Sequence, residues 1–150
     1  MRSLFSRAIL LTSFLTIAGI LMTISRSSAQ SSDNITAMTD KYWIDYESYL
    51  KRAVAEKNPH NCAVILNQMV KELTPKAAEL NAKTAAWKKS HNQMEQIQLM
   101  SATQGNKHKV AALKYFMDPS LSMRSGQSEE LHKAMKNMID NLPVSKINTM

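Results

Sequence analysis

The sequence predicts an all-α protein, a single-domain bundle of four to five helices behind an N-terminal signal sequence. Three observations support this class. Apolar residues recur every three or four positions over most of the chain, which is the period of a helical face. After residue 29, no stretch alternates polar and apolar residues for long enough to form a strand. The length of 150 residues fits one domain without internal repeats, and we expect the bundle to occupy residues 38–143.

Residues 1–29 have the three parts of a secretory signal peptide. Two arginines stand near its start, residues 8–24 form an apolar centre, and Ser27-Ser28-Ala29 provides a small-residue cleavage site. An uncleaved membrane anchor is the alternative, because 17 residues is about the shortest apolar stretch that spans a bilayer. Either reading places the remainder of the chain outside the cytoplasm, in the periplasm or secreted.

The charge distribution argues against a nucleic-acid partner. The formal net charge is +7, and removal of the three leader arginines lowers it to +4. The remaining basic residues are dispersed in short groups such as Lys51-Arg52 and Lys88-Lys89, without a recognisable nucleic-acid-binding motif. A weak contact with an anionic membrane or cell-envelope surface stays open. The expected partner is a protein whose identity and stoichiometry the sequence does not specify.

The first helix is expected from about Thr39 to Lys57, after a flexible polar lead-in at residues 30–37. Core packing explains the aromatic residues of this helix, and an anchor surface for a partner protein is the alternative. The predicted apolar face carries Trp43, Tyr46, Leu50, Ala53 and Val54.

A long second helix is predicted to begin at Asn58-Pro59, because asparagine is a good N-cap and proline is tolerated at the first helical position. Pro75 leaves two readings: Thr74 caps a new helix there, or one helix kinks at the proline. We favour the kink, because the apolar stripe keeps its phase across Pro75. The stripe consists of Leu66, Val70, Leu73, Ala77, Leu80, Thr84, Trp87, His91 and Met94.

Two shorter helices are predicted in the remaining chain. One lies between a break at residues 104–106 and Asp118-Pro119, and residues 119–127 are expected to form a loop. The last helix starts with Ser128 as its N-cap and ends at Pro143, before a tail at residues 144–150. Its apolar stripe consists of Leu131, Met135, Met138 and Leu142.

No catalytic constellation can be read from the sequence, so we expect no enzyme activity. The glycines are too few and too scattered for a phosphate-binding loop. The acidic pairs, Asp45 with Glu47 and Glu129 with Glu130, do not share a helical face. Cys62 is the only cysteine and lies in an apolar run, which predicts a buried structural thiol; an intermolecular disulfide is the alternative.

Histidine and methionine provide the one pattern of chemical interest. A spacing of three places a histidine and a methionine on one helical face. Imidazole and thioether groups are suitable ligands for Cu(I), and they could also be the axial ligands of a haem bound between helices. The competing interpretation is core packing by methionine, with no cofactor. The sequence therefore predicts an exported interaction protein without catalysis and, as the alternative, a copper- or haem-binding bundle. The candidate ligands are His91, Met94, His132, Met135 and Met138.

Overall fold

The computed structural model describes residues 31–142, which form six α-helices and no strand. The all-helical class is confirmed, and the expected count of four to five helices is too low. Within this range, none of the helices has the length and apolarity needed to cross a membrane. The predicted signal peptide or anchor at residues 1–29, the helix stop at Pro143 and the tail at residues 144–150 lie outside the described residues.

The helices follow one another through short connections. Helix α2 is the first of them and is followed by a long α3, three short helices and the final α7. Their bounds are α2 Ser32–Ala55, α3 Pro59–Ser90, α4 Gln93–Gln104, α5 Lys107–Phe116, α6 Pro119–Gln127 and α7 Glu129–Asn141.

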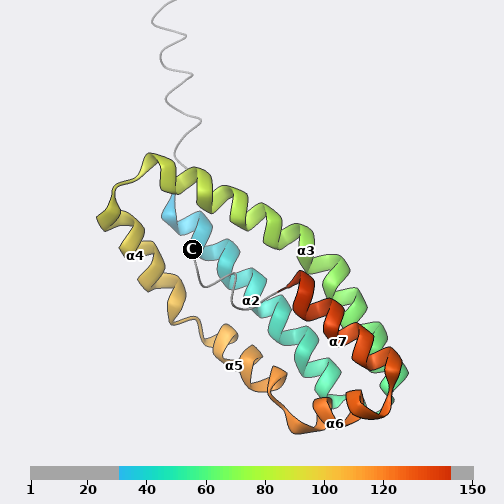
Figure 1. Cartoon of the computed structure of the whole chain (residues 1–150). Coiled ribbons are helices and arrows are strands. Elements are labelled where there is room, and N and C mark those ends of the chain that lie inside the picture. Colours follow the sequence, from blue (N-terminus) through green and yellow to red (C-terminus); the bar gives the residue numbers. More distant parts are fainter. Residues whose placement is uncertain (1–30, 143–150) are drawn as a thin grey trace, which may run out of the picture. The chain divides into compact units, whose positions relative to one another are not determined.

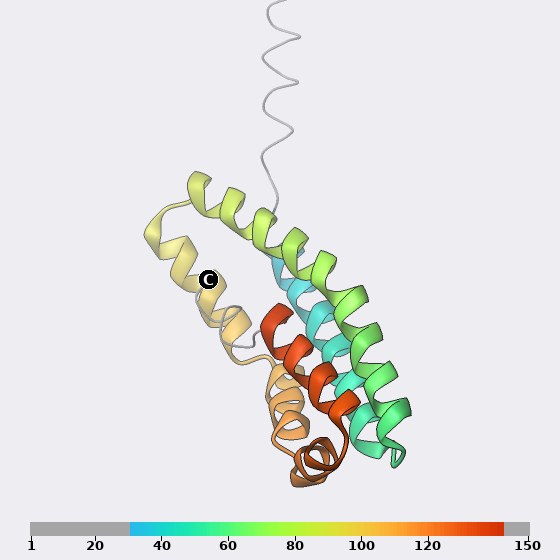
Figure 2. The same cartoon turned by 45° about the vertical axis from the view of Figure 1, so that its right-hand side comes forward.

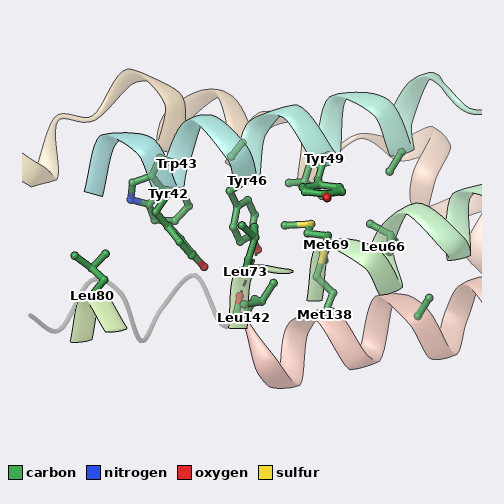
Figure 3. Close-up of a cluster of buried hydrophobic side chains, with 14 of the residues drawn as sticks. Tyr42, Trp43, Tyr46, Tyr49, Leu66, Met69, Leu73, Leu80, Met138 and Leu142 are labelled. Carbon is green, nitrogen blue, oxygen red and sulfur yellow. Dashed lines mark hydrogen bonds between the residues drawn. The ribbon is translucent and has the colours of Figure 1, made fainter. Parts of the chain in front are cut away.

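Helix α2 is the centre of the bundle (Figures 1 and 2). It contacts α3, α4, α5 and α6, while α7 packs on α3 and α6. Helix α3 runs back along α2, and α4 and α5 together return along another side of α2 (Figure 1). The apolar core therefore lies between α2, α3, α5 and α7, and it includes the aromatic side chains of α2 (Figure 3).

Helix α2 begins seven residues before the expected Thr39, so the predicted flexible lead-in is wrong for residues 32–37. Ile35 is only 1% exposed and extends the apolar face by one turn. Polar residues around Ile35 obscured this turn in the sequence, yet polar residues are compatible with the solvent-facing side of a helix. The aromatic residues Tyr42, Trp43 and Tyr46 are buried, which confirms their predicted place in the core.

Helix α3 is one helix with Pro75 inside it, as the phase of its apolar stripe predicted, and the alternative in which Thr74 caps a new helix is wrong. The side chain of Asn58 caps its start, accepting hydrogen bonds from the backbone N–H groups of His60 and Asn61 at 2.9 and 3.3 Å. The helix ends at Ser90, however, with His91 as its C-cap. A capping box between Asn92 and Glu95 then starts α4, so the predicted extension of the stripe to Met94 is wrong.

Residues 119–127 form helix α6, and the predicted loop is wrong. Asp118 caps this helix by accepting a hydrogen bond from the Ser120 backbone N–H at 2.8 Å, and Pro119 occupies its first turn. Leu121 is fully buried, and the Arg124 guanidinium donates a hydrogen bond to the carbonyl oxygen of Val54 at 3.1 Å. An Asp-Pro pair can end one helix and also start the next. The loop was predicted because Asp118-Pro119 was interpreted only as a helix end.

The single cysteine and the last helix agree with the sequence analysis. Cys62 is buried, its thiol donates to the carbonyl oxygen of Ala53 at 3.3 Å, and burial raises the pKa of the thiol. Ser128 caps α7, where its hydroxyl accepts a hydrogen bond from the Leu131 backbone N–H at 3.3 Å. Both features stabilise the bundle without supplying reactive chemistry.

Candidate functional site

An open groove of about 320 Å³ lies between α2 and α3, and we call it the α2–α3 groove. Its α2 wall consists of Asn34, Met38, Lys41 and Tyr42. Its α3 wall consists of Lys76, Glu79, Leu80 and Lys83. Spacings of three and four place each set on one side of its helix, beside the buried stripes that hold the two helices together.

A tyrosine with a buried hydroxyl lines the groove. Tyr42 is 2% exposed, and its hydroxyl has no hydrogen-bond partner among residues 31–142. The Tyr42 side chain extends away from α2, as Figure 3 shows. Burial, followed by the influence of the neighbouring Tyr46, raises the pKa of Tyr42 above its ordinary value. The hydroxyl is therefore protonated at neutral pH and keeps its capacity to donate a hydrogen bond.

The rim of the groove carries more positive than negative charge. The ammonium group of Lys76 pairs with the carboxylate of Asp45 at 2.8 Å, and that of Lys83 pairs with Glu79 at 2.6 Å. Lys41 takes part in no ion pair with any residue in the described range. The carboxylates of Asp45 and Glu79 balance the positive charges of Lys76 and Lys83. The charge of Lys41 is not balanced in this way, so the groove has one net positive charge.

A second, smaller cavity of about 50 Å³ lies on another side of Leu80, whose side chain lines both spaces. Its walls come from four helices, α2, α3, α4 and α5. The ammonium group of Lys109 lies 5.8 Å from the centre of the Trp43 ring, and burial lowers the pKa of this lysine. The volume is enough for one or two water molecules and is small for an organic ligand.

The first predicted His/Met pair is divided by the end of α3. The His91 ring stacks on Trp87 at 4.0 Å between ring centres, and its Nδ1 lies 2.7 Å from the Trp87 carbonyl oxygen. Met94 belongs to α4 and is 65% exposed. His91 is therefore the C-cap of α3, held there by stacking on Trp87 and by a hydrogen bond to the Trp87 carbonyl oxygen.

The second predicted set also divides, although all three residues lie on α7. Met138 is 1% exposed and belongs to the hydrophobic core. His132 and Met135 line a surface hollow, where the His132 Nδ1 lies 3.5 Å from the Ser125 hydroxyl. Of the α7 set, only His132 and Met135 therefore share an accessible space.

The two sets lie at opposite ends of α3. The His60 Nδ1 is 2.9 Å from the Glu130 carboxylate, which places the start of α7 beside the start of α3. His91 follows the other end of this 32-residue helix, which is about 48 Å long. His91 and His132 consequently cannot bind one copper ion together or coordinate the two faces of one haem. Nor does the described part of the chain contain a cluster of three His, Cys, Asp or Glu side chains able to hold a metal ion.

Two polar contacts between α2 and α5 were missed by the sequence analysis. The His108 Nδ1 lies 2.6 Å from the Glu47 carboxylate, and the Asn106 amide donates to the Asp40 carboxylate at 2.5 Å. These partners are more than 60 residues apart along the chain, so spacing gave no signal for them. Their location between two packed helices indicates a structural role, holding α5 against α2.

The α2–α3 groove was also missed, because its lysines resemble an ordinary solvated surface in the sequence. The Glu79–Lys83 pair has the spacing of four that helical ion pairs use, but such pairs are common on exposed helices. No family model, curated protein or solved structure matches this chain.

Proposed function

We propose that the chain is an exported helical protein that acts by binding, without catalysis, and that the α2–α3 groove is its binding site. The observation that carries this proposal is the buried Tyr42 hydroxyl, which has no hydrogen-bond partner among the described residues. A buried polar group without a partner destabilises a fold by about 1–3 kcal/mol. A ligand that accepts a hydrogen bond from Tyr42 would offset this penalty on binding.

The size of the groove favours a small molecule as its occupant. Its volume of about 320 Å³ lies within the usual range of small-molecule sites. The walls combine apolar surface from Met38 and Leu80 with a few polar groups, which is the usual composition of such sites. Export, by a signal peptide at residues 1–29, would place this groove in the periplasm or outside the cell.

Purification from the native compartment tests the proposal. The wild-type protein is compared with two variants, Met38→Arg, which fills the groove, and Met117→Arg, a control at a side chain that is 77% exposed on α5's C-cap. Molecules released by denaturation are identified by mass spectrometry. We expect one small molecule at near-stoichiometric yield from wild type and Met117→Arg, and its loss from Met38→Arg.

The same experiment can overturn the proposal. Recovery of no molecule from wild type, or of equal amounts from both variants, would show that the groove is not the binding site. Thermal unfolding of each purified variant checks that Met38→Arg remains folded. A stoichiometric protein in place of a small molecule would support binding but would contradict the groove as a small-molecule site.

Copper binding is the second candidate function. It is favoured by the surface hollow in which His132 and Met135 lie together. An imidazole and a thioether suit Cu(I), but two protein ligands form an incomplete coordination sphere. A titration with Cu(I), described in the Discussion, separates this candidate from binding at the α2–α3 groove.

A further inference from the structure

We infer that the ligand of the α2–α3 groove is a small amphiphile with one carboxylate group and an apolar body. This inference rests on the proposed function and specifies its ligand class. Three properties of the groove lead to it: its apolar walls, its single net positive charge and the buried hydroxyl of its lining residue Tyr42, which has no hydrogen-bond partner among residues 31–142.

The apolar part of the ligand follows from the walls. The Leu80 side chain is almost fully buried between the groove and the smaller cavity, and Met38 is half-buried opposite it on α2. Methionine is flexible and polarizable, so its side chain adapts to apolar ligands of different shape. Tyr42 also lines the groove, with 2% of the residue exposed. An alkyl or aromatic ligand body would gain free energy by burial against these three side chains.

The charge of the ligand follows from the lysines. Lys76 and Lys83 already have carboxylate partners at 2.8 and 2.6 Å, in Asp45 and Glu79. Lys41 supplies the one positive charge that these carboxylates do not balance. A monoanion matches that charge, whereas a phosphate dianion exceeds it and a cationic ligand would meet three ammonium groups. The Lys83 ammonium lies 3.7 Å from the Met38 sulfur, so it also borders the space that the apolar body would fill.

The carboxylate of the ligand would be the acceptor for Tyr42. The hydroxyl is protonated at neutral pH and has no acceptor within residues 31–142. A hydrogen bond to an ionised oxygen is stronger than one between neutral groups, so a carboxylate is favoured over an alcohol of the same length. Tyr42 would thereby discriminate between ligand head groups, and Met38 and Leu80 would select for an apolar body.

A set of four ligands with the same alkyl chain tests this inference. Octanoate, octanol, octylammonium and octyl phosphate are titrated below their micelle concentrations into the mature chain, labelled with ¹³C at the methionine methyl groups. The Met38 methyl signal reports on the groove, and the exposed Met117 methyl is the internal control. We expect a saturable shift of Met38 alone, with octanoate binding at least tenfold more tightly than the other three ligands.

Two pairs of variants test whether the Tyr42 hydroxyl and the Lys41 ammonium group are responsible for the preference for octanoate. Tyr42→Phe should weaken octanoate binding about tenfold, while Tyr115→Phe, on α5 and outside the groove, should leave it unchanged. Lys41→Gln should weaken it about two- to fivefold, while Lys51→Gln, an exposed lysine of the same helix, should not. The octanol affinity should fall less than the octanoate affinity in Tyr42→Phe, because the lost hydrogen bond is between neutral groups, and it should not respond to Lys41→Gln.

The results that would overturn the inference differ from those that would overturn the proposed function. Equal binding of octanoate and octanol, tighter binding of octylammonium or octyl phosphate, or an unchanged octanoate affinity in Tyr42→Phe would each refute the carboxylate. The groove would remain a binding site if Met38→Arg still lost the molecule that co-purifies with wild type. A Met38 signal that responds to none of the four ligands would likewise refute the ligand class alone.

Discussion

The hydroxyl of Tyr46 donates a hydrogen bond to the carbonyl oxygen of Leu142, 3.3 Å away and 96 residues further along the chain. This bond connects the middle of α2 to the residue that caps the end of α7. Tyr42 lies one turn before Tyr46, with 5.9 Å between the ring centres, but no described residue accepts a hydrogen bond from its hydroxyl. The two buried tyrosines therefore differ in whether the hydroxyl has a hydrogen-bond acceptor. Tyr46 has one and is a structural residue, whereas Tyr42 has none among the described residues and is a candidate binding residue.

The two tyrosines should respond oppositely to removal of the hydroxyl. Tyr46→Phe removes a hydrogen bond and should lower the free energy of unfolding by about 1 kcal/mol. Tyr42→Phe removes a buried hydroxyl without a described partner, so the free energy of unfolding should stay the same or rise by up to about 1 kcal/mol. Urea unfolding of the ligand-free protein measures both values. A loss of stability in Tyr42→Phe equal to that in Tyr46→Phe would show that Tyr42 has a partner within the protein.

Arg124 should be important for the position of α6. Its guanidinium donates a hydrogen bond to the Val54 carbonyl oxygen in the last turn of α2, where a positive charge is favourable. Arg124→Met keeps most of the alkyl stem and should lower the free energy of unfolding by about 1–2 kcal/mol. Lys114→Met, at an exposed site on α5, is the control and should change it by less than about 0.5 kcal/mol. Equal effects of the two substitutions would argue against this contact.

The N-cap of α6 should make stability depend on pH in acid. Hydrogen bonds from the Ser120 hydroxyl and backbone N–H lower the pKa of Asp118 below its usual value of 3.8. The unfolded chain therefore takes up this proton at a higher pH than the folded chain does. The stabilisation is complete above the unfolded pKa and is lost as the pH falls through the lower, folded pKa.

Asp118→Asn isolates this effect, because asparagine is also a good N-cap but does not titrate. The wild-type protein should be more stable than the variant near pH 6, and the difference should shrink towards pH 2. Urea unfolding across this range measures the difference directly. A difference that stays constant with pH would show that the Asp118 carboxylate gains nothing from folding.

Copper should distinguish the two predicted His/Met sets. Any Cu(I) bound by the chain should depend on His132, which shares a hollow with Met135, and not on His91, which stacks on Trp87. Competition with a Cu(I) chelator gives the affinities of the wild type, His132→Ala and His91→Ala. An equal loss of affinity in both variants would contradict the separation of the two sets by the length of α3.

The sequence was sufficient for those helices whose apolar stripes are long and regular. Leu66, Leu73 and Leu80 show this for α3, where the constant phase across Pro75 favoured one helix, kinked at the proline, over two helices. The prediction failed where a local signal has two meanings. Asp118-Pro119 ends α5 and also starts α6, and the Asn92–Glu95 capping box was overlooked inside what resembled one long stripe.

The candidate site depended on contacts that the sequence does not encode locally. Lys76 of α3 pairs with Asp45 of α2, which is 31 residues away in the sequence. Glu72, four residues before Lys76, accepts a hydrogen bond from Gln68 at 3.0 Å. Whether a buried tyrosine hydroxyl finds an acceptor depends on how two helices are packed. Burial of Tyr42 could therefore be predicted from its place beside the apolar face, whereas its place in the lining of a groove required the structure.

We propose that the Tyr42 hydroxyl donates its hydrogen bond to a ligand in the α2–α3 groove. The most direct test is a crystal structure of the mature protein, residues 30–150, purified from its native compartment without removal of bound molecules. We expect electron density for a small molecule in the groove, with an acceptor atom about 2.5–3.0 Å from the Tyr42 hydroxyl oxygen. A structure in which another residue of the chain accepts the Tyr42 hydrogen bond, with no molecule in the groove, would contradict it.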